Sequence, residues 1–259
     1  IFSEIYKFMD LIEKLKILQN HLNVGNLSKV IEGCSKILKK TPDNPFVLNL
    51  CGLALQKNGQ ADASKKYFIR AIDLEPKNIA AINNLANSYK SLGKIELAEK
   101  LYLKAIDLNP RYINALNNYG NLKFQLNHFN DAKDLFKKAL SINDTEITLL
   151  FGLASALQGN GEFDETIEIL KKVLKIEKKN ASAHKLMSAI LNYKEKSKEA
   201  NDHLEEMKNL IQDKDLNNNQ KIDLSFALGK ALEEAGHFDL SFNHIHKGNF
   251  LKKKKLTTT

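Results

Sequence analysis

The chain has 259 residues, of which 43% are hydrophobic and 27% are charged, and its formal net charge is +8. This composition is ordinary for a folded soluble protein, and four prolines with no tryptophan leave little room for a loop-rich or all-β design. Arginine, which binds phosphate groups bidentately, occurs only as Arg70 and Arg111. Because the lysines are scattered among Asp and Glu, we expect solvated helix faces and no nucleic-acid partner.

Hydropathy and the cysteines restrict the compartment. No run of about 18 apolar residues is present, so we expect no membrane partner. The N-terminal stretch IFSEIYKFMDLIEKLKIL is amphipathic and lacks the apolar centre of a signal peptide. Cys34 and Cys51 form no CxxC motif, and we expect both to act as small apolar residues in a reducing compartment. The sequence therefore predicts a cytoplasmic protein without a cofactor or a metal. The chain opens on Ile1, which indicates a fragment or a natural start at Met9.

After an N-terminal extension, residues 1–10, the predicted elements are pairs of helices. Ala98, Tyr102 and Ala105 mark one helix, because their spacing of i, i+4 and i+7 forms a single stripe. Gly93 lies just before this helix, and we expect it to end the preceding helix with a positive φ. Pro110 follows the second helix and starts the next pair. Each block therefore reads as helix, tight turn, helix and proline-marked turn.

A period of 34 residues organises these pairs. The two best blocks match at the positions expected for packing, namely Asn84 with Asn118, Asn87 with Asn121, Ala98 with Ala132, Tyr102 with Phe136 and Ala105 with Ala139. Since one helix pair cannot bury its apolar stripe alone, such an array needs several repeats. Extending the period in both directions gives five repeats over residues 11–180, which are 11–44 (degenerate), 45–78, 79–112, 113–146 and 147–180.

The period breaks after Asn180. Residues 181–221 are predicted to form an irregular helical repeat with an insert, and we expect altered stacking between residues 194 and 221. Its second helix is predicted over 201–212, and the polar run DKDLNNNQK that follows is predicted to be a loop. A final repeat is predicted over 222–255, and the tail 256–259 is either a frayed end or a cut edge.

One repeat resembles the tetratricopeptide repeat (TPR), since it carries that pattern in Leu85, Ala86, Tyr89, Gly93, Ala98, Tyr102, Ala105 and Pro110. The resemblance is strong over 45–180 and weak over 11–44 and 181–221. It implies an all-α fold, an α-solenoid in which about seven helix-turn-helix repeats form a right-handed superhelix. It also implies that the first helix of each repeat lines the concave side.

Two narrower resemblances concern the function. The runs AINNLANSY and ALNNYGNLK are similar to repeats of the protein O-GlcNAc transferase superhelix, in which asparagines hold the backbone of an extended substrate. Asn84 and Asn118 match those asparagines, whereas the match fails at Leu50 and Gly152. Any such series of asparagines is therefore short in this chain.

The segments ASAHKLMSAI and LSFALGKALEEAGHFDLSFNHIHKGNFLKKK resemble the end of the repeat region in bacterial repeat-sulfotransferase fusions. That resemblance implies that this chain is the non-catalytic N-terminal part of a sulfotransferase. The chain has no Gly-rich phosphate loop, and no catalytic site is predicted within it. The alternatives are the repeat region of a glycosyltransferase or a self-contained assembly scaffold without an enzyme domain.

The candidate site is the wall formed by the first helices, which is rich in side-chain amides and nearly free of charge. An amide has both a donor and an acceptor, so it pairs with a peptide backbone of any sequence. We therefore predict a scaffold or substrate-presenting module that binds extended polypeptide; the alternative is that these asparagines only cap or solvate helices. The candidate residues are Asn49, Asn83, Asn84, Asn87, Lys90, Asn117, Asn118, Asn121, Phe124, Phe151, Ser155 and Gln158.

The histidines give no metal or catalytic pattern. His244 and His246 are two residues apart on a predicted helix and so point to different faces. His128 and His237 occupy predicted turns. We therefore expect structural or surface roles for the histidines.

Overall fold

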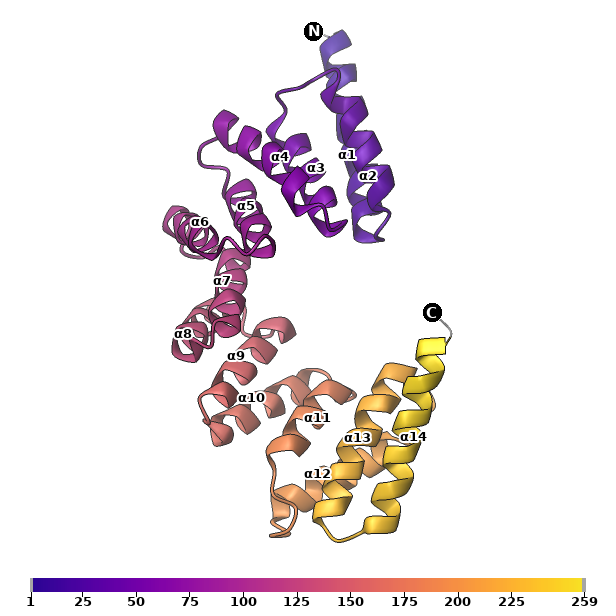
Figure 1. The fold of residues 1–259 in the computed structure, drawn as a ribbon. Helices are drawn as coiled ribbons and strands as arrows, with labels where there is room; N and C mark the ends of the chain where they lie inside the picture. The colour runs from indigo at the N-terminus through magenta and orange to yellow at the C-terminus, as the bar shows by residue number, and fades with distance from the viewer. Residues whose placement is uncertain (1, 258–259) are drawn as a thin grey trace. The chain divides into compact units, whose positions relative to one another are not determined.

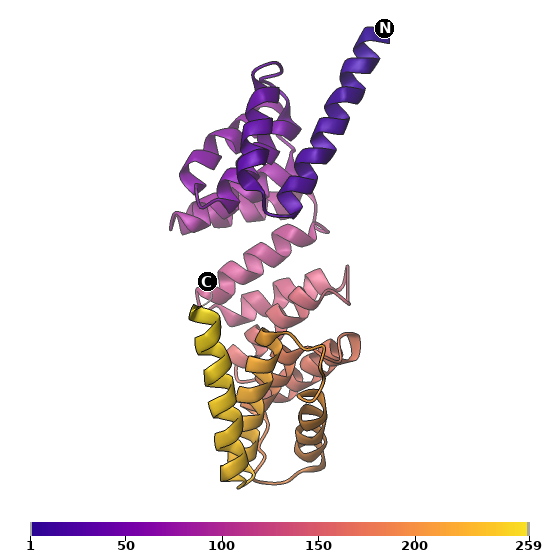
Figure 2. The same cartoon turned by 90° about the vertical axis from the view of Figure 1, so that its right-hand side faces the viewer.

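The computed structural model describes the backbone of residues 2–257 and the side chains of residues 9–257. Within this range every regular element is helical, and the fold is an all-α solenoid, as predicted (Figures 1 and 2). None of the described helices has both the length and the apolar character that a bilayer crossing requires. The helices are α1 (Phe2–Asn23), α2 (Leu27–Leu38), α3 (Pro45–Lys57), α4 (Ala61–Leu74), α5 (Ile79–Ser91), α6 (Ile95–Leu108), α7 (Ile113–Gln125), α8 (Phe129–Leu140), α9 (Ile147–Gly159), α10 (Phe163–Ile176), α11 (Ala181–Ile190), α12 (Lys198–Leu210), α13 (Asn218–Glu234) and α14 (Phe238–Thr257).

The chain divides into two compact units, residues 1–122 and residues 123–259, and the boundary lies within α7. We call them the N-terminal unit and the C-terminal unit. Odd-numbered helices are the first members of the pairs and even-numbered helices are the second members.

Asparagines just before several first helices explain where those helices begin. The side-chain oxygen of Asn44 accepts a hydrogen bond from the backbone N of Val47 at 3.1 Å, which caps α3. Asn78 caps α5 and Asn180 caps α11 in the same way, each at 3.0 Å. A cap of this kind satisfies one of the unpaired N–H groups of the first turn and is worth about 1 kcal/mol.

The tight turn within each pair depends on a residue in the left-handed region. Gly93 has a φ of 71°, which confirms the predicted turn after α5. Asn127, 34 residues later, has a φ of 59° at the corresponding place. Asparagine tolerates this conformation better than other non-glycine residues, so the turn survives the replacement.

In the N-terminal unit, small residues allow the helices to approach closely. A Cβ on Gly52 of α3 would lie 2.6 Å from Cε1 of Phe68 of α4, so the ring fills the space of the missing side chain. Phe68 itself is fully buried. Cys34 and Cys51 are also fully buried, as free thiols within the apolar cluster that joins α2 and α3.

In the C-terminal unit the same kind of approach links successive pairs. A Cβ on Gly152 of α9 would lie 2.6 Å from Cε1 of Phe136 of α8. At the end of the unit, α13 and α14 lie side by side in both views (Figures 1 and 2). The Ser241 hydroxyl of α14 donates to the carbonyl of Gly229 of α13 at 2.7 Å.

Several predicted boundaries shift in the structure. Residues 2–10 are not a separate extension but the start of α1. The second helix predicted over 201–212 is α12, Lys198–Leu210, because Ser197 caps it through the N–H of Ala200. The predicted polar loop ends early, since Asn217 and Gln220 form a capping box that starts α13 at Asn218. Of the predicted tail, residues 256 and 257 belong to α14, and residues 258–259 lie outside the described residues.

Candidate binding surface on the first helices

A series of asparagines connects the first helices of the N-terminal unit. Nδ2 of Asn84 on α5 donates to Oδ1 of Asn49 on α3 at 3.0 Å. The same bond recurs 34 residues later, where Nδ2 of Asn118 on α7 donates to Oδ1 of Asn83 at 3.1 Å. Nδ2 of Asn83 is 3.5 Å from Oδ1 of Asn84 and links the two bonds. We call Asn49, Asn83, Asn84 and Asn118 the amide ladder.

The amide ladder changes the role of some predicted site residues. Asn83 is only 3% exposed, so its side chain contributes to the packing between repeats and not to an accessible wall. The prediction that places Asn83 on a ligand-binding face is therefore corrected. The side-chain N–H groups of Asn84 and Asn118, the two positions that match the glycosyltransferase asparagines, are engaged by the preceding repeat.

Beside the amide ladder lie three half-exposed asparagines with unused hydrogen-bonding groups. Oδ1 of Asn87 accepts a hydrogen bond from the buried hydroxyl of Tyr102, and no described residue accepts from its NH₂ group. Nδ2 of Asn121 donates to Oδ1 of Asn117 at 3.3 Å, so Oδ1 of Asn121 and the NH₂ of Asn117 have no partner among the described residues. Together these groups offer both donors and acceptors on α5 and α7.

Lys90 is the charged member of this set. Its side chain is half-buried on α5, and burial lowers the pKa of the ammonium below its ordinary value. Among the described residues no carboxylate forms an ion pair with it. A partly desolvated ammonium without a counter-ion favours a negatively charged partner.

A polar network behind α5 was missed at the sequence level. Nε2 of Gln56 on α3 donates to the carbonyl of Asn84 at 2.8 Å and to Oγ of Ser88 at 2.7 Å. Ser88 in turn lies 2.8 Å from Oγ of Ser64 on α4, and both serines are fully buried. The asparagine series draws attention to the first helices, but nothing in the sequence pairs Gln56 with a residue 32 positions away.

The remaining candidate residues belong to the C-terminal unit. The ring of Phe124 packs against Phe129, with 5.5 Å between the ring centroids. Phe151, Ser155 and Gln158 are half-exposed along α9. The amide ladder has no counterpart on α9, because Gly152 stands at the position of Asn84 and Asn118.

The C-terminal unit holds a buried chain of rings that the sequence did not indicate. Nδ1 of His184 on α11 is 3.1 Å from Nε2 of His203 on α12, and Nδ1 of His203 is 2.6 Å from the Tyr193 hydroxyl. At the other end, Nε2 of His184 is 3.4 Å from the carbonyl oxygen of Lys178. We call these three rings the His–Tyr chain. One arrangement satisfies it: Tyr193 donates to His203, His203 to His184, and His184 to the carbonyl.

The His–Tyr chain has no spare group for chemistry. Burial, and next the neighbouring His184, lower the pKa of His203 to about 3, and burial also lowers the pKa of His184. Burial raises the pKa of Tyr193. All three groups are therefore neutral at pH 7, with both nitrogens of His203 already paired. The described residues hold no group of three or more His, Cys, Asp or Glu side chains placed to bind a metal.

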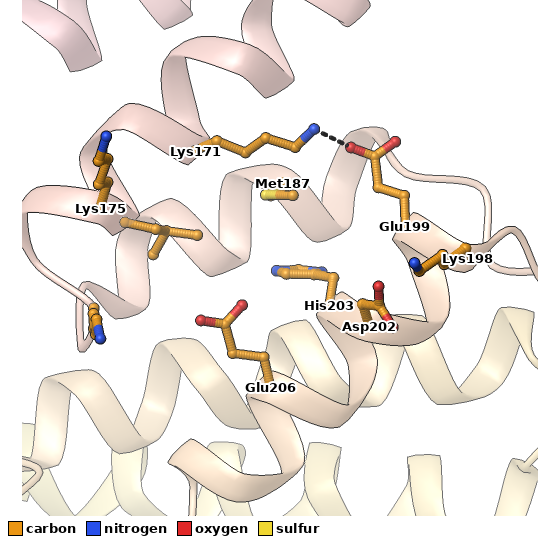
Figure 3. Close-up of a pocket in the computed structure, with 10 residues that line it drawn as sticks. Lys171, Lys175, Met187, Lys198, Glu199, Asp202, His203 and Glu206 are labelled. Carbon is orange, nitrogen blue, oxygen red and sulfur yellow. Dashed lines mark ion pairs between the residues drawn. The ribbon is translucent and has the colours of Figure 1, made fainter.

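An open hollow of about 770 Å³ lies above the His–Tyr chain, between α10, α11 and α12 (Figure 3). His203 and Met187 line it, and its rim carries both signs of charge. Lys171 forms an ion pair with Glu199 across the rim at 2.6 Å. With its charges of both signs and its histidine neutral, the hollow gives no selective site for one class of ion.

Comparison with known proteins identifies the family. The family model of the N-terminal TPR repeat region of Psidin matches residues 13–140. That of the middle TPR-like domain of cilia and flagella-associated protein 70 matches residues 82–211, about half of the chain. The chain belongs to the tetratricopeptide repeat family. No curated protein matches this TPR chain in sequence.

Solved TPR structures share the fold at low sequence identity. A TPR protein from Parabacteroides merdae has a TM-score of 0.60 and 19% identity, and 92% of each chain is covered. The C-terminal part of a TPR protein from Cytophaga hutchinsonii has a TM-score of 0.65 and 14% identity, covering 89% of this chain and 93% of its own. YrrB, a TPR protein with an unusual peptide-binding site, has a TM-score of 0.55 and 15% identity, covering 82% of this chain and 97% of its own.

Proposed function

We propose that this TPR protein is a scaffold or substrate-presenting module that binds an extended polypeptide along α5 and α7 of the N-terminal unit. The observation that carries the proposal is the set of unsatisfied, half-exposed amide groups on Asn87, Asn117 and Asn121, beside Lys90. Side-chain amides pair with backbone N–H and C=O groups alike, so they suit a ligand held by its main chain. YrrB, which has a similar fold, is described by its peptide-binding site, and this supports a peptide ligand.

The amide ladder supports this proposal by fixing the geometry of the surface. Asn49, Asn84 and Asn118 hold the first helices of three consecutive repeats in register through side-chain bonds. A binding surface whose supports are already ordered loses less conformational entropy when the ligand arrives. The ladder therefore acts as the support, and Asn87, Asn117 and Asn121 act as the contacts.

Lys90 gives the proposed ligand one chemical preference. An acidic side chain that reaches Lys90 neutralises a partly desolvated ammonium, and such charge-assisted hydrogen bonds are stronger than neutral ones. We therefore propose an extended peptide with one Asp or Glu, in place of the multiply acidic C-terminal tails that require several basic residues. Those residues are absent from the repeats 45–180, where the corresponding positions include Phe46, Asn49 and Asn83.

The test starts from a random peptide library panned on the intact chain, followed by calorimetry on the best binder. Asn121→Ala removes an amide whose one side-chain bond is to Asn117 at 3.3 Å, and Lys90→Met removes the ammonium while keeping the side-chain length. Each change leaves the amide ladder and the Tyr102 bond in place. We expect each to weaken binding by roughly 3- to 10-fold, the range of one lost hydrogen bond.

The matched control is Asn209→Ala on α12, which removes an exposed asparagine that has no side-chain bond among the described residues. This variant should keep wild-type affinity. If Asn121→Ala and Lys90→Met also keep wild-type affinity for the selected peptide, the proposed surface is wrong.

The link to an enzyme stays a prediction from the sequence resemblance over residues 181–255. In that proposal the peptide-binding surface presents a substrate to a sulfotransferase domain, with glycosyl transfer as the second choice. The gene sequence beyond Thr259 tests it. A Gly-rich phosphate loop following a strand supports a sulfotransferase, whereas a stop codon favours the self-contained scaffold.

A further inference from the structure

The last helix carries an exposed aromatic stripe. Phe238, Phe242, His246 and Phe250 follow one another at intervals of four residues and so lie along one side of α14. Phe238 and Phe242 are each 68% exposed and Phe250 is 61% exposed. The rings of Phe242 and His246 stack with 6.1 Å between their centroids. We call these four residues the aromatic stripe of α14.

Phe242 occupies a position that contacts the following repeat in earlier second helices. The corresponding residue of α4 is Lys65, whose Nζ lies 5.8 Å from the centre of the Tyr89 ring on α5. The corresponding residue of α8 is Lys133, whose Nζ lies 2.7 Å from Oε1 of Glu162. On α14 the same position holds a large apolar ring that no described residue of a following repeat covers.

His246 repeats this relation one turn further along. Its counterpart on α8, Lys137, forms an ion pair with Glu165 at 2.8 Å, and its counterpart on α10, Lys171, forms one with Glu199 at 2.6 Å. The aromatic stripe therefore continues the surface through which one repeat of this fold binds the next. In α14 that surface has aromatic residues where the internal repeats have charged ones.

We propose that the aromatic stripe is a homodimer interface, in which α14 packs antiparallel against α14 of a second copy. The charges on the helix support this occupant and this orientation. The lysines of α14 gather at its C-terminal end, from Lys252 to Lys255, whereas Asp239 lies in its first turn and Glu233 lies near the end of α13. An antiparallel pair places each lysine run near the acidic end of the other copy, whereas a parallel pair places the two runs together.

The aromatic stripe is centred on the middle of its helix, which also suits a two-fold axis. In an antiparallel pair Phe238 faces Phe250 of the second copy, and Phe242 faces His246 of the second copy. The same residues thus meet on both sides, as a two-fold interface requires. The exposed fractions of the three phenylalanines correspond to roughly 400 Å² per copy, or about 800 Å² for the pair, with rings of about 200 Å² each. Flanking residues bring this to the lower end of specific interfaces, so we expect a dimer of micromolar affinity.

Sedimentation equilibrium of the full chain over a range of about 1 to 200 µM tests the proposal, since this range spans a micromolar dissociation constant. Wild type should shift from monomer to dimer within it. The double variant Phe242→Glu/Phe250→Glu changes only exposed rings, and its helix content should be unchanged by circular dichroism. We expect this variant to stay monomeric throughout. The matched control is Phe46→Glu on α3, a phenylalanine that is 53% exposed and lies in the N-terminal unit, and it should dimerise like wild type.

A charge exchange tests the orientation. Asp239→Lys and Lys253→Glu should each weaken the dimer by roughly 3- to 10-fold, since each places like charges together. The double variant Asp239→Lys/Lys253→Glu should recover most of the loss, because both copies carry both changes. A wild-type chain that stays monomeric, or a dimer unaffected by Phe242→Glu/Phe250→Glu, overturns the proposal. A dimer that the single charge changes leave unaltered overturns the antiparallel arrangement.

Discussion

Asn83 shows how a polar side chain can hold repeats together. It is almost fully buried, yet its oxygen accepts a bond from Asn118 and its NH₂ group lies 3.5 Å from Oδ1 of Asn84. Burying an amide is favourable only when its donors and acceptors are paired, and Asn83 pairs both within the amide ladder. The ladder therefore joins three first helices through one buried residue.

Replacing Asn83 should destabilise the N-terminal unit. Asn83→Ala leaves the NH₂ of Asn118 and Oδ1 of Asn84 without these partners, so we expect the free energy of unfolding to fall by about 1–3 kcal/mol. Urea denaturation followed by circular dichroism measures the change. The control is Asn209→Ala, which should lower the free energy by less than about 0.5 kcal/mol. Equal effects of the two changes would remove the stabilising role assigned to the ladder.

Gly52 provides a second test at the level of single residues. In an exposed helix, Gly→Ala is stabilising by about 1 kcal/mol. At Gly52 the added Cβ would lie 2.6 Å from the ring of Phe68, so we expect Gly52→Ala to destabilise the protein by about 1–3 kcal/mol instead. The double variant Gly52→Ala/Phe68→Leu should be less destabilised than the sum of the two single changes. Thermal denaturation of all three variants checks this, and strict additivity would contradict the proposed clash.

At the level of elements, the pair α11 and α12 differs from the other pairs because the His–Tyr chain replaces an all-apolar contact. His184 and His203 are buried in their neutral forms, and their pKa values are lowered by burial. In the unfolded chain both would have pKa values near 6.5. The unfolded state therefore binds more protons than the folded state between pH 6.5 and about 3.

This difference predicts an acid-sensitive element. The stability contributed by the neutral histidines is fully present above pH 6.5 and is lost as the pH falls towards 3. For His203 alone the loss is about 1.4 kcal/mol per pH unit, or about 2 kcal/mol at pH 5. Urea denaturation at pH 7.5 and pH 5 should show this dependence in wild type and less of it in His203→Gln. His128→Gln, at an exposed histidine, should keep the wild-type dependence, and an unchanged dependence in His203→Gln would exclude this source.

At the scale of the whole molecule, the net charge of +8 is dispersed and the proposed binding surface carries only one lysine. Peptide binding should therefore depend weakly on salt, changing by less than about 3-fold between 50 and 500 mM NaCl. Binding to a labelled DNA duplex should be weak and should be lost over the same range, since release of counter-ions dominates it. Fluorescence anisotropy measures both. Tight DNA binding that survives 500 mM NaCl would contradict the assignment of a polypeptide partner.

The sequence was sufficient to predict the all-α solenoid, because the period of 34 residues recurs in Gly, Ala and Pro positions whose roles are local. It located the asparagines on the first helices for the same reason. It did not predict that Asn83 is buried or that Tyr102 binds Asn87, because those bonds depend on side-chain orientation across a helix interface. The pairing of His184 with His203 was missed because the irregular repeat removes the period that would align α11 with α12.

The amide ladder also has a direction. In the bonds that join successive repeats, each NH₂ group points towards the preceding repeat, from Asn118 to Asn83 and from Asn84 to Asn49. At the α7 end the group without a partner among the described residues is therefore the acceptor Oδ1 of Asn118, and at the α3 end it is the NH₂ of Asn49. A strand laid beside it must bring an N–H to one end and a carbonyl to the other. Of the two ways a peptide can run, N to C or reversed, only one offers both groups in the right order.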